Sequence, residues 1–341
     1  MTDQEFKQRL EEWLSIQFNK QCVIEELKPL SGGACQENSL ITLRFVDDGS
    51  KKRLVYRSDK GSALFASLPR EYEFRVAQIA YQHGVKTPKP YFLEETENIT
   101  GKKFYVMEAL SGRTDVRYIT KDSSLNSIRP KILDELAKNL ALIHSITLES
   151  QELDFLLKIY HREHPFHPSK FAIQEMKQEI EKLDEPHPAM YLAINWLEEN
   201  VPTYEDITLV HGDFRTGNFL VSENGLEGIL DWEFAHVGNP YEDISWFCLR
   251  DWRFGQIKKE AGGFADREEF YELYEKYSQK KVDKKSVLFW EVMGNLRWAV
   301  GTIGQTERHL QGKTRGIELA AIGRRTAEME YEMMRLIENA I

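Results

Sequence analysis

Apolar positions near the start of the chain first follow a helical period and then the shorter period of strands. The spacing of Leu10, Trp13, Leu14 and Phe18 predicts an amphipathic helix over residues 3–18. Three strands, a helix and two further strands are expected after it, separated by turn signals. The expected ranges of these six elements are 22–30, 39–46, 53–58, 70–83, 91–95 and 103–108.

After about residue 108 the pattern changes to longer helical periods. Residues 111–113 are expected to form a connector, and a strand-rich island is expected over 208–231. The pattern therefore predicts two domains, 1–108 and 109–341, the first small and β-rich and the second larger and mostly helical. The expected helices of the second domain are 130–146, 171–183, 190–199, 267–277 and 316–337.

Composition narrows the class of protein. The chain has 341 residues, of which 41% are hydrophobic, so it can bury a sizeable core. A formal net charge of −10 disfavours nucleic acid as a partner. The three cysteines are odd in number and form no Cys-x-x-Cys pair, which indicates neither a disulfide framework nor a zinc ribbon. Because no signal peptide or membrane-spanning apolar run is recognised, we expect a cytoplasmic protein without a membrane partner.

The strand-rich island contains a strong hairpin signal. Asn224 and Gly225 separate two short apolar runs, which favours a two-residue type I′ turn. Counting outward from that turn sets Asn218 opposite Asp231 at the open end of the hairpin. An amide oxygen and a carboxylate are the hard ligands that Mg²⁺ prefers, so we expect these two residues to bind Mg²⁺.

The loop before this pair carries the second candidate group. His211-Gly212-Asp213 follows a short apolar run, and Asp213 is placed to accept the proton of an attacking hydroxyl. These residues, with Asn218 and the run 229–235, resemble the aminoglycoside phosphotransferase and choline-kinase-like group of small-molecule kinases. Protein kinases would show His-Arg-Asp and Asp-Phe-Gly instead, and no activation segment ending in Ala-Pro-Glu follows.

The resemblance implies an α+β, bilobal, protein-kinase-like fold with a small N-terminal antiparallel sheet and a larger helical lobe. It also implies ATP and Mg²⁺ as cofactors. Asp213 would be the catalytic base, and Asn218 and Asp231 would hold the metal. Asp243 matches a family position that either buttresses the loop or caps the next helix.

In such a fold the first lobe holds the nucleotide. Ser31, Gly32 and Gly33 lie between the first two expected strands, where backbone N–H groups could approach phosphate oxygens. Alone, this segment is more typical of a simple turn than of a phosphate-binding loop. The backbone of the segment from Glu108 to Leu110 is expected to form the hinge that binds adenine.

The resemblance also requires a cation on the third strand and an acid on the following helix. Arg57 stands where most kinases have lysine, and Lys60 is the alternative. Arginine can clamp phosphate with two donors but cannot lose its charge. Glu71 is the expected partner of Arg57, with Glu73 as the alternative.

The acceptor is less well indicated than the chemistry. The segments 246–253 and 297–298 bring aromatic and arginine side chains, which suit an acidic or partly apolar acceptor and are at least as typical of core aromatics with solvated arginines. The resemblance over 205–255, and more loosely over 297–335, is to the kinase-like domains of acyl-CoA dehydrogenase family members 10 and 11. It implies a hydroxy-acid or hydroxyacyl acceptor.

Two other functions stay open at this point. The chain could be an aminoglycoside kinase, although a polycationic acceptor calls for a carboxylate-lined pocket. It could also be a pseudokinase scaffold that binds nucleotide without turnover. Among the candidate site residues, only Arg57, which replaces the usual lysine, is consistent with this alternative. The sequence indicates neither the oligomeric state nor a preference between ATP and GTP.

Overall fold

The chain folds into two compact units, each of which takes two segments of the sequence. The first unit consists of residues 1–113 and 219–235, and the second of residues 114–218 and 236–341. No helix among the described residues is long and apolar enough to cross a membrane. The computed structural model describes residues 1–30, 36–59, 67–160, 166–203, 206–312 and 316–340.

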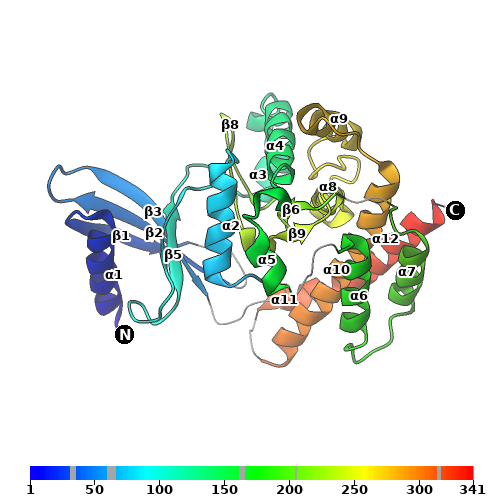
Figure 1. Cartoon of the computed structure of the whole chain (residues 1–341), viewed down its shortest axis with the longest axis horizontal. Helices are drawn as coiled ribbons and strands as arrows, with labels where there is room; N and C mark the ends of the chain where they lie inside the picture. Colours follow the sequence, from blue (N-terminus) through cyan, green and yellow to red (C-terminus); the bar gives the residue numbers. More distant parts are fainter. Residues whose placement is uncertain (31–35, 60–66, 161–165, 204–205, 313–315, 341) are drawn as a thin grey trace. The chain divides into compact units, whose positions relative to one another are not determined.

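The first unit is built on a five-stranded antiparallel sheet with two helices (Figure 1). Its elements are α1 (Asp3–Phe18), β1 (Cys22–Pro29), β2 (Gln36–Phe45), β3 (Lys51–Asp59), α2 (Arg70–Gln82), β4 (Pro90–Glu94), β5 (Phe104–Glu108), β7 (Phe219–Ser222), β8 (Gly225–Ile229) and the 3₁₀ turn η3 (Trp232–Phe234). The strand order of the sheet is β1-β2-β3-β5-β4. The expected helix, five strands and intervening helix of this region are therefore confirmed.

Alternation along the strands gives the sheet two different faces. On one face, Leu54 and Tyr56 of β3 pack in an apolar core with Leu10 of α1. Arg57 points to the other face, where it forms an ion pair with Glu73 of α2. The sheet therefore turns its apolar face to α1 and a charged position to α2.

The hairpin of β7 and β8 is attached to the first unit by the loop that precedes β4. The Ile229 N–H donates to the Lys86 carbonyl at 2.8 Å, and the Thr87 hydroxyl donates to the Ile229 carbonyl at 2.9 Å. The Trp232 indole donates to the Thr87 hydroxyl at 3.0 Å. These bonds fix the end of β8 and the start of the segment that contains Asp231.

The turn of this hairpin differs from the expected one. Ser222 pairs with Gly225, so the two-residue loop is Glu223-Asn224 rather than Asn224-Gly225. A type I′ turn needs positive φ at both loop positions, whereas here Gly225 has a φ of 120° and Asn224 is not among the residues with positive φ.

A hydroxyl group and a bulge account for the difference in register. The Ser222 hydroxyl accepts a hydrogen bond from the Asn224 N–H at 3.0 Å and donates to the Glu227 carboxylate at 2.5 Å. The register then shifts by one residue at Glu227: Leu220 pairs with Gly228 and Val221 pairs with Leu226, so the ladder skips Glu227. The expected register, which set Asn218 opposite Asp231, is therefore wrong.

Over the residues that the structure describes, the second unit is mostly helical and contains one short antiparallel strand pair. Its strands are β6 (Thr208–Val210) and β9 (His236–Gly238). Its α-helices are α3 (Val116–Lys121), α4 (Arg129–His144), α5 (Asp154–Ile159), α6 (Pro168–Ile180), α7 (Pro188–Glu199), α8 (Tyr241–Cys248), α9 (Arg267–Ser278), α10 (Lys284–Leu310), α11 (Ile317–Ile322) and α12 (Thr326–Glu338). Its 3₁₀ turns are η1 (Ser123–Leu125), η2 (Leu148–Ser150), η4 (Arg250–Arg253) and η5 (Gly323–Arg325).

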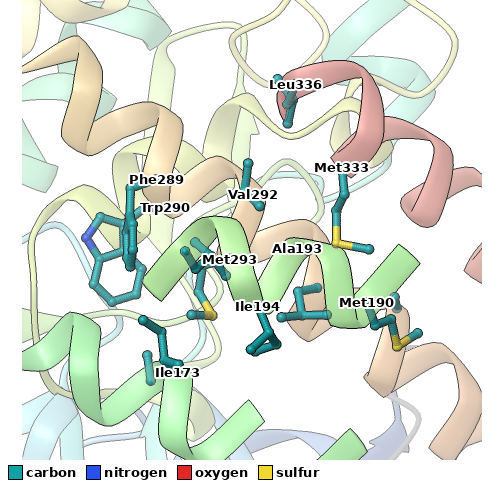
Figure 2. Packing of buried hydrophobic residues seen from close by; sticks show 14 of the residues in the cluster. Ile173, Met190, Ala193, Ile194, Phe289, Trp290, Val292, Met293, Met333 and Leu336 are labelled. Atoms are coloured by element: carbon teal, nitrogen blue, oxygen red, sulfur yellow. The ribbon is translucent and has the colours of Figure 1, made fainter. Parts of the chain in front are cut away.

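The long helix α10 contributes to the apolar core of the second unit from several of its turns. Phe289, Trp290 and Met293 of this helix pack in one cluster with Ile194 of α7 and Met333 of α12 (Figure 2). Helix α10 was not among the expected helices. The helix expected over 316–337 is also different, since the 3₁₀ turn η5 separates α11 from α12.

Candidate active site

The loop of residues 211–218, here called the HGD loop, follows strand β6 directly. Its backbone has positive φ at Gly212 (80°) and at Gly217 (113°), which is the region that favours glycine. A Cβ atom at position 217 would lie 2.7 Å from Nη1 of Arg215, so a side chain there would displace the guanidinium. Glycine at both positions lets the loop gather the polar side chains between them.

The buried carboxylate of Asp213 receives three side-chain hydrogen bonds. Asn218 Nδ2 donates to Oδ2 at 2.6 Å and to the Asp213 carbonyl at 3.0 Å. Arg215 Nε and Trp246 Nε1 both donate to Oδ1, each at 2.9 Å. The structure thus brings together the predicted residues Asp213 and Asn218. Because Asn218 uses its amide nitrogen on Asp213, its amide oxygen is the atom suited to a cation.

A second carboxylate supports the backbone of the same loop. Asp243 of α8 accepts hydrogen bonds from the His211 N–H at 2.7 Å and the Gly212 N–H at 2.9 Å. The buried ring of His144 bridges this carboxylate, at 3.2 Å, and the Tyr274 hydroxyl, at 2.9 Å. Of the two roles expected for Asp243, the structure confirms that of a buttress of the loop.

The predicted cation Arg57 lies at the centre of a buried charge network in the first unit. Its Nη2 atom is 2.6 Å from Glu73 Oε1 and 2.5 Å from Asp231 Oδ1. Glu73 also binds the guanidinium of Arg70 and accepts a hydrogen bond from the Tyr105 hydroxyl at 3.2 Å. Burial disfavours the charge of Arg57, but the carboxylates of Glu73 and Asp231 outweigh it and hold its pKa above the ordinary value.

The expected partner of Arg57 was the wrong glutamate. Glu71, the expected partner, forms an ion pair with Lys103 at 3.1 Å, and Glu73 lies beside Arg57. Both residues are in the first turn of α2, but Glu73 is buried and Glu71 is half-buried. The predicted pairing of strand cation and helix acid is therefore present with a different acid.

Asp231 follows the end of β8 in an unusual backbone conformation. Its φ and ψ of 73° and 66° lie in the left-handed region, which is uncommon for residues other than glycine. Such strain persists where the surroundings hold it, and it concentrates at functional sites. Here the ion pair with Arg57 and the hydrogen bonds at the end of β8 hold the segment in place.

The donor set of the predicted metal pair fits Mg²⁺. Asn218 and Asp231 offer an amide and a carboxylate oxygen, and Mg²⁺ takes few protein ligands and completes its shell with water and phosphate oxygens. Within the described ranges, no three or more His, Cys, Asp or Glu side chains gather to hold a metal by themselves. Each of the two residues thus offers an oxygen of the kind that Mg²⁺ binds, Asn218 from the second unit and Asp231 from the first.

The remaining predicted nucleotide residues are only partly described. Ser31, Gly32 and Gly33 lie outside the described residues. At the predicted hinge, the N–H of Glu108 donates to the Lys89 carbonyl at 2.8 Å. A Cβ atom on Gly228 would lie 2.7 Å from Cδ1 of Leu110, so the hairpin backbone packs closely on this segment.

An aromatic cluster adjoins Asp213 in the second unit. The ring of Trp252 lies 5.5 Å from that of Trp246 and 5.1 Å from that of Trp298, and Arg215 lies 4.5 Å above it. Sequence reasoning singled out the tryptophans but missed Arg215. Its position two residues after Asp213 was the available signal.

Two arginines from the expected acceptor segments have structural partners instead. Arg297 forms an ion pair with Glu242 at 2.5 Å, and Arg253 lies 3.2 Å from Glu260. Burial opposes the ionisation of Glu242, but Arg297 and the adjacent His236 outweigh it and hold the pKa of this carboxyl well below its ordinary value. These arginines neutralise buried or half-buried acids of the second unit.

The profile of the phosphotransferase enzyme family matches residues 26–279. The chain belongs to this family. It is 30% identical over 222 residues to acyl-CoA dehydrogenase family member 10 of Mus musculus. The aligned region covers 63% of this chain and 19% of that protein. It is 27% identical over 336 residues to the probable acyl-CoA dehydrogenase IBR3 of Arabidopsis thaliana, which covers 91% and 39%. The chain thus spans less than half the length of these relatives.

Solved structures share the fold of this phosphotransferase family member. A putative aminoglycoside phosphotransferase from Ralstonia eutropha aligns with a TM-score of 0.72 at 24% identity, covering 96% of this chain and 98% of that one. The ethanolamine kinase of Plasmodium vivax aligns with a TM-score of 0.62 at 16% identity, covering 91% and 83%. The expected kinase-like fold and the resemblance to acyl-CoA dehydrogenase family members 10 and 11 are confirmed.

Proposed function

We propose that this protein transfers the γ-phosphoryl group of ATP to a hydroxyl group of a small molecule, with Mg²⁺ as the required cation. The observation that carries the proposal is the buried Asp213 carboxylate, which Asn218, Arg215 and Trp246 hold within the HGD loop. In a member of a phosphotransferase family, a carboxylate fixed in this way is suited to accept the proton of an attacking hydroxyl.

In the proposed reaction, the acceptor oxygen forms a bond to the γ-phosphorus while the bond from that phosphorus to the β–γ bridging oxygen breaks. The leaving group is ADP, and the proton of the acceptor hydroxyl moves to Asp213. General-base help of this kind is worth ~10²–10⁴ in rate. Asp243 supports the step indirectly, because it holds the backbone of His211 and Gly212.

The nucleotide is assigned to residues of the first unit. Arg57 would contact the α- and β-phosphates, and its ion pair with Glu73 supports this role by fixing the guanidinium. Ser31, Gly32 and Gly33 would approach the phosphates through their backbone N–H groups. The backbone of Glu108 and Leu110 would bind adenine.

The metal is assigned to Asn218 and Asp231. The chain order supports this pair, since Asn218 directly precedes Phe219 of β7, Phe219 pairs with Ile229 of β8, and Asp231 follows two residues later. When bound, Mg²⁺ would neutralise charge on the phosphate groups of the nucleotide.

For the acceptor, we assign a hydroxy-acid or a hydroxyacyl derivative. The cluster of Trp246, Trp252 and Trp298 supports a partly apolar acceptor, because Trp246 and Trp298, packed on the buried Trp252, keep part of their rings exposed. The relatives named acyl-CoA dehydrogenases point to acyl chemistry in the same proteins. A polycationic aminoglycoside would be better matched by a wall of carboxylates.

An ATP-consumption screen over hydroxy-acids, hydroxyacyl-CoAs, amino alcohols, sugars and aminoglycosides tests the proposal. We expect Asp213→Asn to retain Mg·ATP binding and to lose transfer to the acceptor that the screen finds. Asp266→Asn is the matched control, since this aspartate is exposed and pairs with Lys259. Transfer by Asp213→Asn at the parent rate would show that the base is misassigned. Turnover of aminoglycosides alone, or of no acceptor, would favour an aminoglycoside kinase or a pseudokinase scaffold.

A further inference from the structure

Helix α8 supports the HGD loop twice. Asp243 in its first turn holds the loop backbone, and Trp246, three residues later, donates to the carboxylate of Asp213. Residues three apart lie on the same side of a helix, so one side of α8 carries both contacts. Trp246 is also the residue within the run 242–249 that stays partly exposed, which indicates that it is not placed there to fill the core.

The hydrogen bonds distinguish the two oxygens of Asp213. Oδ1 receives two N–H donors, from Trp246 and Arg215, whereas Oδ2 receives one side-chain donor among the described residues, from Asn218. An ionised carboxylate oxygen has room for about two donors. Oδ1 is therefore saturated, and Oδ2 keeps capacity for one further donor.

We propose that Trp246 is a positioning residue for phosphoryl transfer, which with Arg215 saturates Oδ1 of Asp213 and so assigns Oδ2 as the oxygen that accepts the proton. The proposal rests on the function proposed above, in which Asp213 is the base. The two oxygens of a carboxylate are chemically equivalent, and rotation about the terminal side-chain bond is soft. The N–H donors of Trp246 and Arg215 remove this freedom before the acceptor binds.

The side chains of Trp246 and Arg215 are themselves held in place by further contacts. The ring of Trp252 packs against the ring of Trp246 at 5.5 Å and under the guanidinium of Arg215 at 4.5 Å. Arg215 Nη1 also donates to the Thr216 carbonyl at 3.2 Å, which fixes the plane of the guanidinium. One buried indole therefore holds both groups that bind Oδ1.

The test uses Trp246→Phe, which keeps an aromatic ring but removes the N–H donor. We expect kcat for phosphoryl transfer to fall by about 10- to 100-fold, the range that misplacement of a reacting group produces. The KM for the acceptor and the affinity for Mg·ATP should stay at parent values, because Asp213 is still present and position 246 still carries an aromatic ring. Trp246→His should recover much of kcat, since Nε2 of a flipped imidazole falls near the position of the indole Nε1.

Trp196→Phe on α7 is the matched control, because it removes an indole of similar exposure that packs on the core. It should transfer phosphate at the parent rate. A Trp246→Phe variant with the parent kcat would overturn the proposal, as would a change confined to the acceptor KM, which would mark Trp246 as a contact of the acceptor. A kcat for Trp246→His no higher than that for Trp246→Phe would also overturn it.

Asp213→Asn, measured in the same series, separates this proposal from the function beneath it. If Asp213→Asn is inactive and Trp246→Phe is unimpaired, only the positioning role is lost. If Asp213→Asn transfers phosphate at the parent rate, the assigned base is wrong whatever Trp246→Phe does.

Discussion

Replacing Glu73 with glutamine is expected to destabilise the protein strongly, whereas the same change at Glu71 is expected to have little effect. Glu73 lies between the guanidinium groups of Arg57 and Arg70 and accepts a hydrogen bond from the Tyr105 hydroxyl. The side chains of Glu73 and Arg57 are only 1% and 6% exposed. Glutamine would preserve the volume but would leave two buried cations short of one negative charge.

The structure sets the size of the effect. Breaking a buried ion pair by removing one partner costs roughly 3–5 kcal/mol. Arg57 retains Asp231 and Arg70 retains Asp59, so we expect the lower end, about 3 kcal/mol of the free energy of unfolding. Glu71 pairs with Lys103, whose side chain is 42% exposed, and such a pair is worth well under about 1 kcal/mol because solvent screens it.

Urea unfolding followed by circular dichroism would measure both variants against the parent, with equal m values required for the comparison. Glu71→Gln is a close control, because it makes the same chemical change in the same helical turn. A loss for Glu73→Gln no larger than the loss for Glu71→Gln would refute the reasoning, since it would show that the network around Arg57 does not depend on the charge of Glu73.

Two further predictions concern titrating groups in the second unit. Because the pKa of Glu242 is held well below its ordinary value, its contribution to stability is complete above the ordinary carboxyl pKa and is lost as the pH falls below about 4.3. Glu242→Gln should therefore lose less stability than the parent between pH 7 and pH 3 in urea titrations, and equal losses would contradict the assignment. Burial raises the pKa of the Cys248 thiol to about 12, so iodoacetamide at pH 8 should modify this residue in urea but not in the native protein. Mass spectrometry would locate the label, and equal labelling in both states would contradict the burial.

The sheet of the first unit and the loop around Asp213 could be predicted because their signals are local. Alternating apolar residues and the Asp47–Ser50 turn mark the strands, and the order of Asp213, Asn218 and Asp231 marks the candidate site. Asp213 and Asn218 of the HGD loop are in contact as expected, since they lie five positions apart in one short loop.

The choice between Glu71 and Glu73 was also within reach of the sequence. The buried stripe of α2 includes Ala77 and Ala80, and Glu73 lies on that stripe at helical spacing, whereas Glu71 does not. An acid on the apolar stripe of a helix must have a buried partner. The phase of the helix was therefore the signal that favoured Glu73.

Other features depend on contacts that the apolar pattern of one segment does not reveal. Helix α10 is buried on several sides by α6, α7, α8 and α12, so it lacks a single apolar stripe. The Asn224-Gly225 turn signal was overridden by the hydroxyl of Ser222 and the bulge at Glu227. The partners of α10 are distant in the sequence, whereas the turn was decided by side chains of the same hairpin that the preference of Asn-Gly for a type I′ turn does not take into account.

The first unit is completed by residues 219–235, which are separated from residue 113 by more than a hundred residues of the second unit. Because the ribosome synthesises these segments in sequence order, the first unit is still incomplete when its five-stranded sheet emerges. The bonds that Lys86 and Thr87 make to Ile229 must wait until the hairpin has been synthesised. Separate production of this unit therefore requires a chain that joins residues 1–113 to 219–235, and a simple truncation at residue 113 would leave Arg57 without Asp231.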